Sequence, residues 1–271
     1  VSLTEELGGV ATEKVPLYGN INRALLGSRS PSAFGKMAER AVDMGFETVK
    51  CAPFDEVNRQ LSVDESLRAS ELGLARVAAV RSAIGDQIDL LVDCHSRFLP
   101  EVAGSVANRL AELNIGWFEE PFQPRTDADR LSDLSKNISV TVAGAEGIYG
   151  KNAFVDLLEK GSVSVIMPDV KHCGGVFEAY AAGKASIALG ADVSLHSPSG
   201  PVSQLASAHV TAAIAGGRPL EHAIGETEWR SELLTPAERI SDGYFYLPEG
   251  PGLGTELNLD AITRHGGIIK D

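Results

Sequence analysis

The sequence predicts an α/β fold of the TIM type, a (β/α)8 barrel in which eight parallel strands alternate with helices. Eight short apolar segments alternate with longer segments whose apolar residues recur every three or four positions. The short segments are rich in Val, Ile and Leu and uninterrupted, as expected of parallel strands buried on both faces. The chain has 271 residues, and a single barrel typically fills about 250.

The expected strands are the short apolar segments, taken in chain order. They cover residues 15–21, 47–52, 88–94, 116–120, 139–144, 163–169, 191–196 and 219–224. Helical periodicity is clear in four of the intervening segments, at residues 32–45, 63–85, 99–114 and 175–190. We expect the first of these helices to start at Ser32 as N-cap and to end on Gly45.

An open, doubly wound sheet is the main alternative architecture. That fold usually carries a glycine-rich turn after its first strand, and residues 20–32 contain no G-x-G-x-x-G pattern. The sequence therefore favours the barrel. No linker-like or single-sign charged segment divides the chain, so we expect one barrel domain over residues 15–228. Residues 229–271 are rich in turn-forming residues and are expected to wrap the edge of the barrel.

Composition and charge exclude several functional classes. The chain has 24 basic and 37 acidic residues, a formal net charge of −13, which opposes binding to nucleic acid or to an anionic membrane. No apolar run approaches the ~18 residues of a membrane span, and residues 1–9, VSLTEELGG, show neither the basic start nor the apolar core of a secretion signal. Three cysteines in unrelated contexts favour a reducing compartment. We expect a cytoplasmic enzyme.

Ionisable residues stand at the carboxyl ends of the expected strands. They are Lys50, Asp93, Glu119, Glu146, Asp169, His196 and Glu221. From Asp93 onward they follow one another at intervals of 23 to 27 residues, about one strand–helix unit. Barrel enzymes build their sites from the carboxyl ends of the strands, so these side chains are expected to meet at one mouth.

Three of these residues are carboxylates on consecutive strands. Asp93, Glu119 and Glu146 would repel one another in a single cavity unless a cation were present. Oxygen ligands suit a hard divalent ion, and Mg2+ leaves coordination positions for water and substrate. The alternative interpretation is that acidic residues simply collect at solvated strand ends.

Two histidines are candidates for proton transfer. His196 follows the strand after Asp169, and a carboxylate that orients an imidazole makes it a competent general base. His95 lies two residues after Asp93, so both should face the barrel mouth, which gives a second proton donor. The remaining histidines have no such neighbours in the pattern and are expected to be structural or on the surface: His172, His209, His222 and His265.

Five ordered motifs give the chain a family resemblance. The segments VDCHSRF, WFEEPFQP, VAGAEG, IMPDVKHCGG and SLHSPSGP together resemble the enolase superfamily, in particular its mandelate racemase subgroup. The resemblance implies Mg2+ ligands at Asp93, Glu119 and Glu146. It also implies an Asp169–His196 catalytic dyad, and it gives Glu221 a contact with the substrate carboxylate.

Within the subgroup, the motifs are most similar to those of dehydratases related to D-galactonate dehydratase. Racemases usually carry K-x-K on the second strand, but here Lys50 is followed by Cys51 and Ala52, so the second base is missing. The D-x-H pattern of Asp93 and His95 resembles that of sugar-acid dehydratases, whose histidine protonates the departing hydroxyl. Lys50 is then expected to bind substrate.

The resemblance therefore implies a magnesium-dependent lyase acting on a small carboxylate, an acid sugar. The alternatives are a racemase or epimerase of a 2-hydroxy or amino acid on the same scaffold, and a non-catalytic barrel. Family members carry a capping domain before the barrel. This domain is expected to be absent from the chain, with residues 1–14 as its remnant or a linker. The resemblance also implies a homo-oligomer.

Overall fold

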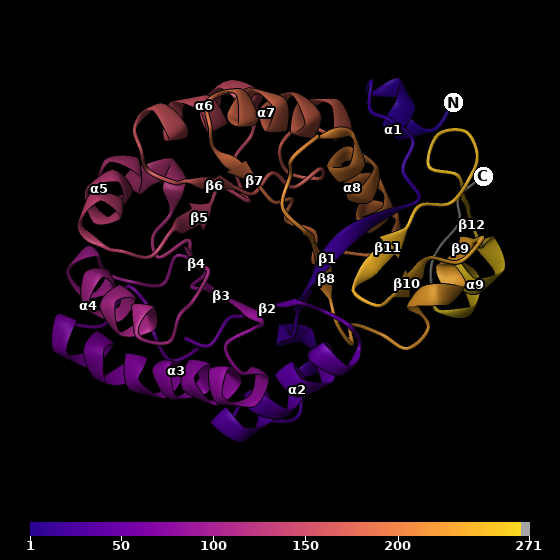
Figure 1. The fold of residues 1–271 in the computed structure, drawn as a ribbon. Coiled ribbons are helices and arrows are strands. Elements are labelled where there is room, and N and C mark those ends of the chain that lie inside the picture. The colour runs from indigo at the N-terminus through magenta and orange to yellow at the C-terminus, as the bar shows by residue number, and fades with distance from the viewer. Residues whose placement is uncertain (267–271) are drawn as a thin grey trace.

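The computed structural model describes residues 1–266 and contains the expected barrel. Eight parallel strands surround a central axis (Figure 1). They are β1 (Lys14–Asn20), β2 (Thr48–Cys51), β3 (Asp89–Asp93), β4 (Trp117–Glu119), β5 (Val142–Gly144), β6 (Val165–Ile166), β7 (Asp192–Val193) and β8 (Leu220–Ala223). Each falls within one residue of, or inside, an expected strand. The predicted fold class is confirmed.

The barrel is closed by the contacts that β8 makes with its two neighbours, β1 and β7. β1 pairs in parallel with both β2 and β8. Between β7 and β8, the backbone N–H of Arg218 donates to the carbonyl of Val193 at 2.7 Å, and that of Glu221 donates to Leu195 at 3.3 Å. The ring of hydrogen bonds is therefore continuous, which brings the carboxyl ends of all eight strands to the same face.

Helices cover the outside of the barrel (Figure 1). They are α2 (Pro31–Asp43), α3 (Val63–Ile84), α4 (Pro100–Ala111), α5 (Pro124–Asn137), α6 (Lys151–Glu159), α7 (Val176–Ala188) and α8 (Pro201–Ala213). The expected N-cap of α2 is wrong by two residues. Ser30, not Ser32, accepts a hydrogen bond from the backbone N–H of Ala33 at 3.2 Å. Pro31 explains the shift, because proline is pre-organised for the first helical position.

Two apolar cores hold the barrel together. The larger one lies between strands and helices. The smaller one fills the barrel interior with Tyr18, Leu91, Trp117, Ala143, Val165 and Met167. Within it, the rings of Tyr18 and Trp117 meet edge to face at 5.7 Å between centroids. The interior is thus packed, and polar chemistry is confined to the strand ends above it.

The terminal segments lie together at one side of the barrel (Figure 1). They contain α1 (Leu3–Glu6), η2 (Arg230–Leu233), β9 (Leu234–Thr235), β10 (Arg239–Ser241), β11 (Tyr244–Tyr246), β12 (Glu256–Leu257) and α9 (Leu259–Arg264), while η1 (Asn22–Ala24) follows β1. β11 pairs antiparallel with the start of β1. The division at residues 14 and 228 stays a prediction, and the end of the expected C-terminal segment, residues 267–271, lies outside the described residues. Among residues 1–266, no helix has both the length and the apolar character that crossing a membrane requires.

Candidate active site at the carboxyl ends of the strands

Lys50 forms the buried centre of the candidate site. Its side chain, on β2, has no exposed surface. Its Nζ lies 2.9 and 3.1 Å from the two carboxylate oxygens of Glu119 on β4, and 2.8 Å from Oε1 of Glu221 on β8. Burial alone would lower the pKa of Lys50, but the two carboxylates hold it well above its usual range. Lys50 is therefore a fixed positive charge between two acids.

Further hydrogen bonds fix the two acids that flank Lys50. The indole N–H of Trp117 donates to Oε2 of Glu119 at 2.9 Å. The amide of Asn20 donates to Oε1 of Glu221 at 2.7 Å, and the backbone N–H of Ser197 donates to Oε2 at 2.9 Å. Burial raises the pKa of Glu119 to about 8. For Glu221, Lys50 and His196 outweigh burial and lower the pKa. Sequence patterns gave no signal for Asn20, Trp117 or Ser197.

Asp169 and His196 form the expected dyad. Nδ1 of His196 lies 2.8 Å from Oδ2 of Asp169, and the backbone N–H of Lys171 donates to the other oxygen at 2.7 Å. Nε2 of His196 faces the site, 3.1 Å from Oε2 of Glu146 and 3.9 Å from Oε2 of Glu221. Burial opposes a charge on His196, but Glu221 and Asp169 raise its pKa to about 9. Because Asp169 contacts one ring nitrogen, the other is directed to the site.

Asp93 and His95 form a second imidazole–carboxylate pair. Asp93 ends β3 and is the register partner of Glu119 at the end of β4. Nε2 of His95 lies 2.9 Å from Oδ2 of Asp93, and the backbone N–H of His95 donates to Oδ1 at 2.9 Å. The hydrogen bond with Asp93 raises the pKa of His95. The His95 side chain is half exposed, so it can exchange protons with a bound molecule.

The three expected metal ligands each contact a cationic group or histidine of the chain itself. Asp93 contacts His95, Glu119 contacts Lys50, and Glu146 contacts His196. Among residues 1–266, the group whose ligand atoms all lie within 4.8 Å of one another is a different one, Asp169, His172 and His196. The assignment of Asp93, Glu119 and Glu146 as ligands thus stays a prediction.

The chemistry of this carboxylate set nevertheless fits a hard divalent cation. Asp93 and Glu119 are neighbours in register and almost fully buried. Besides burial, the charges of Asp93, Glu221 and Glu146 contribute to the raised pKa of Glu119. Mutually repelling buried carboxylates are stabilised by a divalent ion, and oxygen donors are what Mg2+ prefers.

Glu120 is a site residue that sequence reasoning missed. Its Oε1 accepts the backbone N–H groups of Ala145 at 2.9 Å and Glu146 at 3.3 Å, and its Oε2 accepts the hydroxyl of Ser96 at 3.1 Å. Glu120 and three of its neighbours have positive φ: His95 at 47°, Ser96 at 57°, Glu120 at 39° and Ala145 at 84°. Such backbone is costly for residues other than glycine. Glu120 therefore ties the turns after β3 and β5 into one strained frame.

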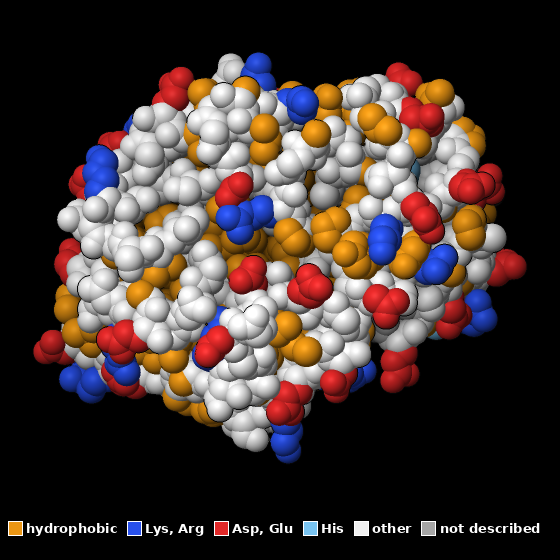
Figure 2. Space-filling view, in the orientation of Figure 1, with side chains coloured by type: hydrophobic (Ala, Val, Ile, Leu, Met, Phe, Trp, Pro, Cys, Tyr) orange, Lys and Arg blue, Asp and Glu red, His pale blue; other side chains and the backbone are white. Residues whose placement is uncertain are grey.

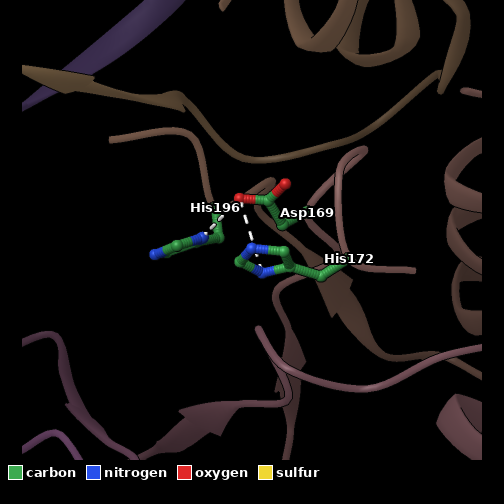
Figure 3. A group of neighbouring side chains, drawn as sticks. All are labelled: Asp169, His172 and His196. Carbon is green, nitrogen blue, oxygen red and sulfur yellow. Dashed lines mark hydrogen bonds and ion pairs between the residues drawn. The ribbon is translucent and has the colours of Figure 1, made fainter. Parts of the chain in front are cut away.

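His172 corrects an expectation. It was expected to be structural or on the surface and to have no carboxylate partner. Its side chain is indeed 47% exposed, but its Nδ1 lies 3.9 Å from Oδ2 of Asp169 (Figure 3). The same nitrogen lies 3.3 Å from the carbonyl of Glu146. The tight turn after β6 folds His172 back onto Asp169, a proximity that the spacing of the two residues could have suggested. The other three histidines are structural: His209 bonds Thr4, His222 stacks on Phe46 and His265 stacks on Trp229.

The face of the molecule seen along the barrel has a central hollow bordered by acidic and basic side chains (Figure 2).

Comparison with known proteins identifies the family to which this chain belongs. The sequence model of the family described as "Enolase C-terminal domain-like" matches residues 33–261. The chain belongs to this family. The predicted resemblance to the enolase superfamily is confirmed.

Among the relatives are proteins named as sugar-acid dehydratases. The chain is 30% identical over 268 residues to a D-xylonate dehydratase of Haloferax volcanii, covering 96% of this chain and 63% of that protein. It is 29% identical over 264 residues to a D-gluconate dehydratase of Thermoproteus tenax, covering 97% of this chain and 52% of the relative. The chain thus spans between half and two thirds of the length of these curated relatives.

Solved structures agree with this assignment. A mandelate racemase/muconate lactonizing enzyme from Jannaschia sp. CCS1 superimposes with a TM-score of 0.87 at 26% identity, over 100% of this chain and 70% of that one. A member of the enolase superfamily from Salmonella Typhimurium gives a TM-score of 0.86 at 26% identity, over 97% of this chain and 71% of that one.

Proposed function

We propose that this chain is the barrel of a Mg2+-dependent hydro-lyase that dehydrates an aldonate-type acid sugar. The reaction removes the proton next to the carboxylate and eliminates the 3-hydroxyl as water. The resulting enol tautomerises to a 2-keto-3-deoxy acid. The names of the relatives support the reaction class, and the site residues support the mechanism.

One observation carries the proposal: two imidazole–carboxylate pairs border the same mouth from opposite sides. Asp93 ends β3 and His95 follows it, whereas His196 follows β7 and its partner Asp169 follows the neighbouring strand β6. The two histidines therefore belong to β3 and β7. These strands are four positions apart in a closed ring of eight. An elimination needs one group to accept a proton and another to donate one, and separate environments allow the two roles.

His196 is the proposed base. Its Nδ1 is held by Asp169 at 2.8 Å, so Nε2 is the nitrogen that accepts the substrate proton once it has lost its own. Because the pKa of His196 is raised to about 9, the fraction of this unprotonated form increases as the pH rises towards that value. Asp169 stabilises the imidazolium that forms. His95 is the proposed acid and protonates the departing 3-hydroxyl, while Asp93 orients its ring.

Lys50 and Glu221, which are buried just beneath the mouth, are proposed to set the charge against which the substrate carboxylate binds. Glu221 Oε2 lies 3.9 Å from Nε2 of His196, so a group bound beside it is within reach of the base. Lys50 Nζ at 2.8 Å neutralises Glu221 and reduces its repulsion of a bound anion. Asp93, Glu119 and Glu146 would hold Mg2+, which as a Lewis acid would stabilise negative charge on the substrate carboxylate.

Product analysis tests the function directly. Purified protein is incubated with a panel of aldonates, with and without Mg2+, and assayed for 2-keto acids. A 2-keto-3-deoxy acid from at least one aldonate, lost when Mg2+ is chelated, is the expected result. An inverted substrate without keto acid would indicate a racemase or epimerase instead. Neither product from the whole panel would favour a non-catalytic barrel.

A further inference from the structure

We propose that Asp169, His172 and His196 form a second divalent-cation site, which prefers a borderline metal such as Zn2+ to Mg2+. A cation bound at this site prevents His196 from acting as the base. The binding part of this inference stands on the geometry alone, and the inhibitory part rests on the proposed function.

The three side chains already lie close to a coordinating arrangement (Figure 3). One ligand atom of each lies within 4.8 Å of the others. Oδ2 of Asp169 is 2.8 Å from Nδ1 of His196 and 3.9 Å from Nδ1 of His172. Ligands at 2.0–2.1 Å from a tetrahedral Zn2+ are separated by about 3.3 Å. The two observed distances lie on either side of that value, so small side-chain rotations suffice.

The backbone fixes two of these ligands in a rigid turn. The backbone N–H groups of His172 and Cys173 both donate to the carbonyl of Asp169, at 2.9 and 2.8 Å. His196 approaches from the end of the neighbouring strand, β7. The His172 side chain is 47% exposed while Asp169 is fully buried. The site therefore has a solvent-facing ligand through which a cation can enter and a buried carboxylate that retains it.

The donor types separate this site from the carboxylate set. Two imidazole nitrogens and one carboxylate suit Zn2+, Co2+ and Ni2+, whereas Mg2+ favours oxygen donors. Asp93, Glu119 and Glu146 offer oxygen only. A protein saturated with Mg2+ at the carboxylate set should therefore still bind Zn2+ at Asp169, His172 and His196.

Binding there would change the tautomer of His196. The Nδ1 that contacts Asp169 at 2.8 Å would have to give its lone pair to the metal. The ring proton would then sit on Nε2, which lies 3.1 Å from Oε2 of Glu146 and can donate to it. Nε2 would no longer be free to accept a substrate proton.

Replacing Lys171 tests the proposed cation site in the opposite direction, because the change should strengthen binding. Its Nζ lies 3.5 Å from Oδ2 of Asp169, so its charge opposes a cation at that oxygen. Replacing it by methionine should tighten Zn2+ binding by roughly two- to fivefold, the range of a partly exposed charge pair.

The experiment titrates ZnCl2 calorimetrically into the protein in saturating MgCl2. Wild type is expected to bind one Zn2+ per chain. His172→Gln is expected to bind about 100-fold more weakly, because losing a direct ligand should cost at least as much as the 10- to 100-fold that losing an outer-shell partner costs. His265→Gln, which changes a histidine stacked on Trp229, is the matched control and should bind like wild type.

Equal Zn2+ affinity in wild type and His172→Gln would overturn the inference, as would no binding by wild type. In turnover assays with saturating Mg2+, Zn2+ should inhibit wild type but not His172→Gln. Failure of the proposed function would look different: no turnover with Mg2+ alone, while Zn2+ binding and its dependence on His172 persisted.

Discussion

Replacing Lys50 by methionine tests the charge balance at the centre of the site. The variant keeps the approximate side-chain volume but removes the ammonium that lies 2.8 Å from Glu221 and 2.9 Å from Glu119. All three side chains are fully buried. Removing one partner of a buried ion pair costs about 3–5 kcal/mol, because the remaining charge is left without compensation.

The lower end of that range is expected here. Burial already raises the pKa of Glu119 to about 8, so this acid can take up a proton when Lys50 is lost, whereas Glu221 stays charged. The predicted loss is therefore about 3 kcal/mol in the free energy of unfolding. Adding Glu221→Gln, which keeps an acceptor for Asn20, should restore part of it, since the unpaired charge is then removed.

Urea unfolding monitored by circular dichroism measures both effects. Lys36→Met, which changes an exposed lysine of α2, serves as the control and should stay within about 0.5 kcal/mol of wild type. A Lys50→Met protein as stable as this control would refute the reasoning. So would a double variant that loses the sum of the two single losses.

Three further predictions concern the frame of the site, the buried histidine of β8 and one turn. Glu120→Ala should lower kcat by about tenfold or more and weaken Mg2+ binding measured calorimetrically. Glu120→Gln can still accept the hydrogen bond from Ala145 and should retain most of the kcat and of the Mg2+ affinity. Equal losses in the two variants would contradict the role of Glu120 in holding the turns together. Burial lowers the pKa of His222 to about 3, so only the unfolded chain takes up this proton below its ordinary pKa of about 6.5. Stability should therefore fall as pH falls from about 6.5 towards 3, and at pH 4.5 wild type should have lost about 2–3 kcal/mol more than His222→Gln in urea unfolding; equal pH slopes would refute this. Gly45→Ala should lower the free energy of unfolding by about 1–3 kcal/mol more than Gly85→Ala, measured by thermal unfolding. Both glycines have positive φ, but only a Cβ at residue 45 would meet backbone, 2.6 Å from Cα of Asp242. Equal losses of stability in the two variants would contradict the clash.

The strands and the residues at their carboxyl ends could both be predicted from the sequence, because both recur once in every strand–helix unit. Strand–helix units of similar length repeat along the chain, and closure of β1 against β8 brings their ends to one face. Asp93 and Glu119 are register partners as a result. The dyad of Asp169 and His196 follows from the same repeat, on neighbouring strands.

What the sequence could not predict depends on contacts across the barrel and on turn geometry. Lys50 lies between acids of β4 and β8, a pairing visible only once the ring is closed. Glu120 accepts hydrogen bonds from backbone N–H groups after β5. Every residue except proline has such a group, so the sequence does not indicate which of them Glu120 contacts. The contact of His172 with Asp169 was not predicted, because it is made through a turn rather than along a strand.

The central claim is that His196 removes the substrate proton and His95 serves the leaving group. It is tested most directly by NMR of an accepted aldonate in D2O with Mg2+. His196→Asn should abolish exchange of the proton next to the carboxylate, whereas His95→Asn should retain exchange and slow the formation of 2-keto acid. Exchange at the wild-type rate in His196→Asn would contradict the account.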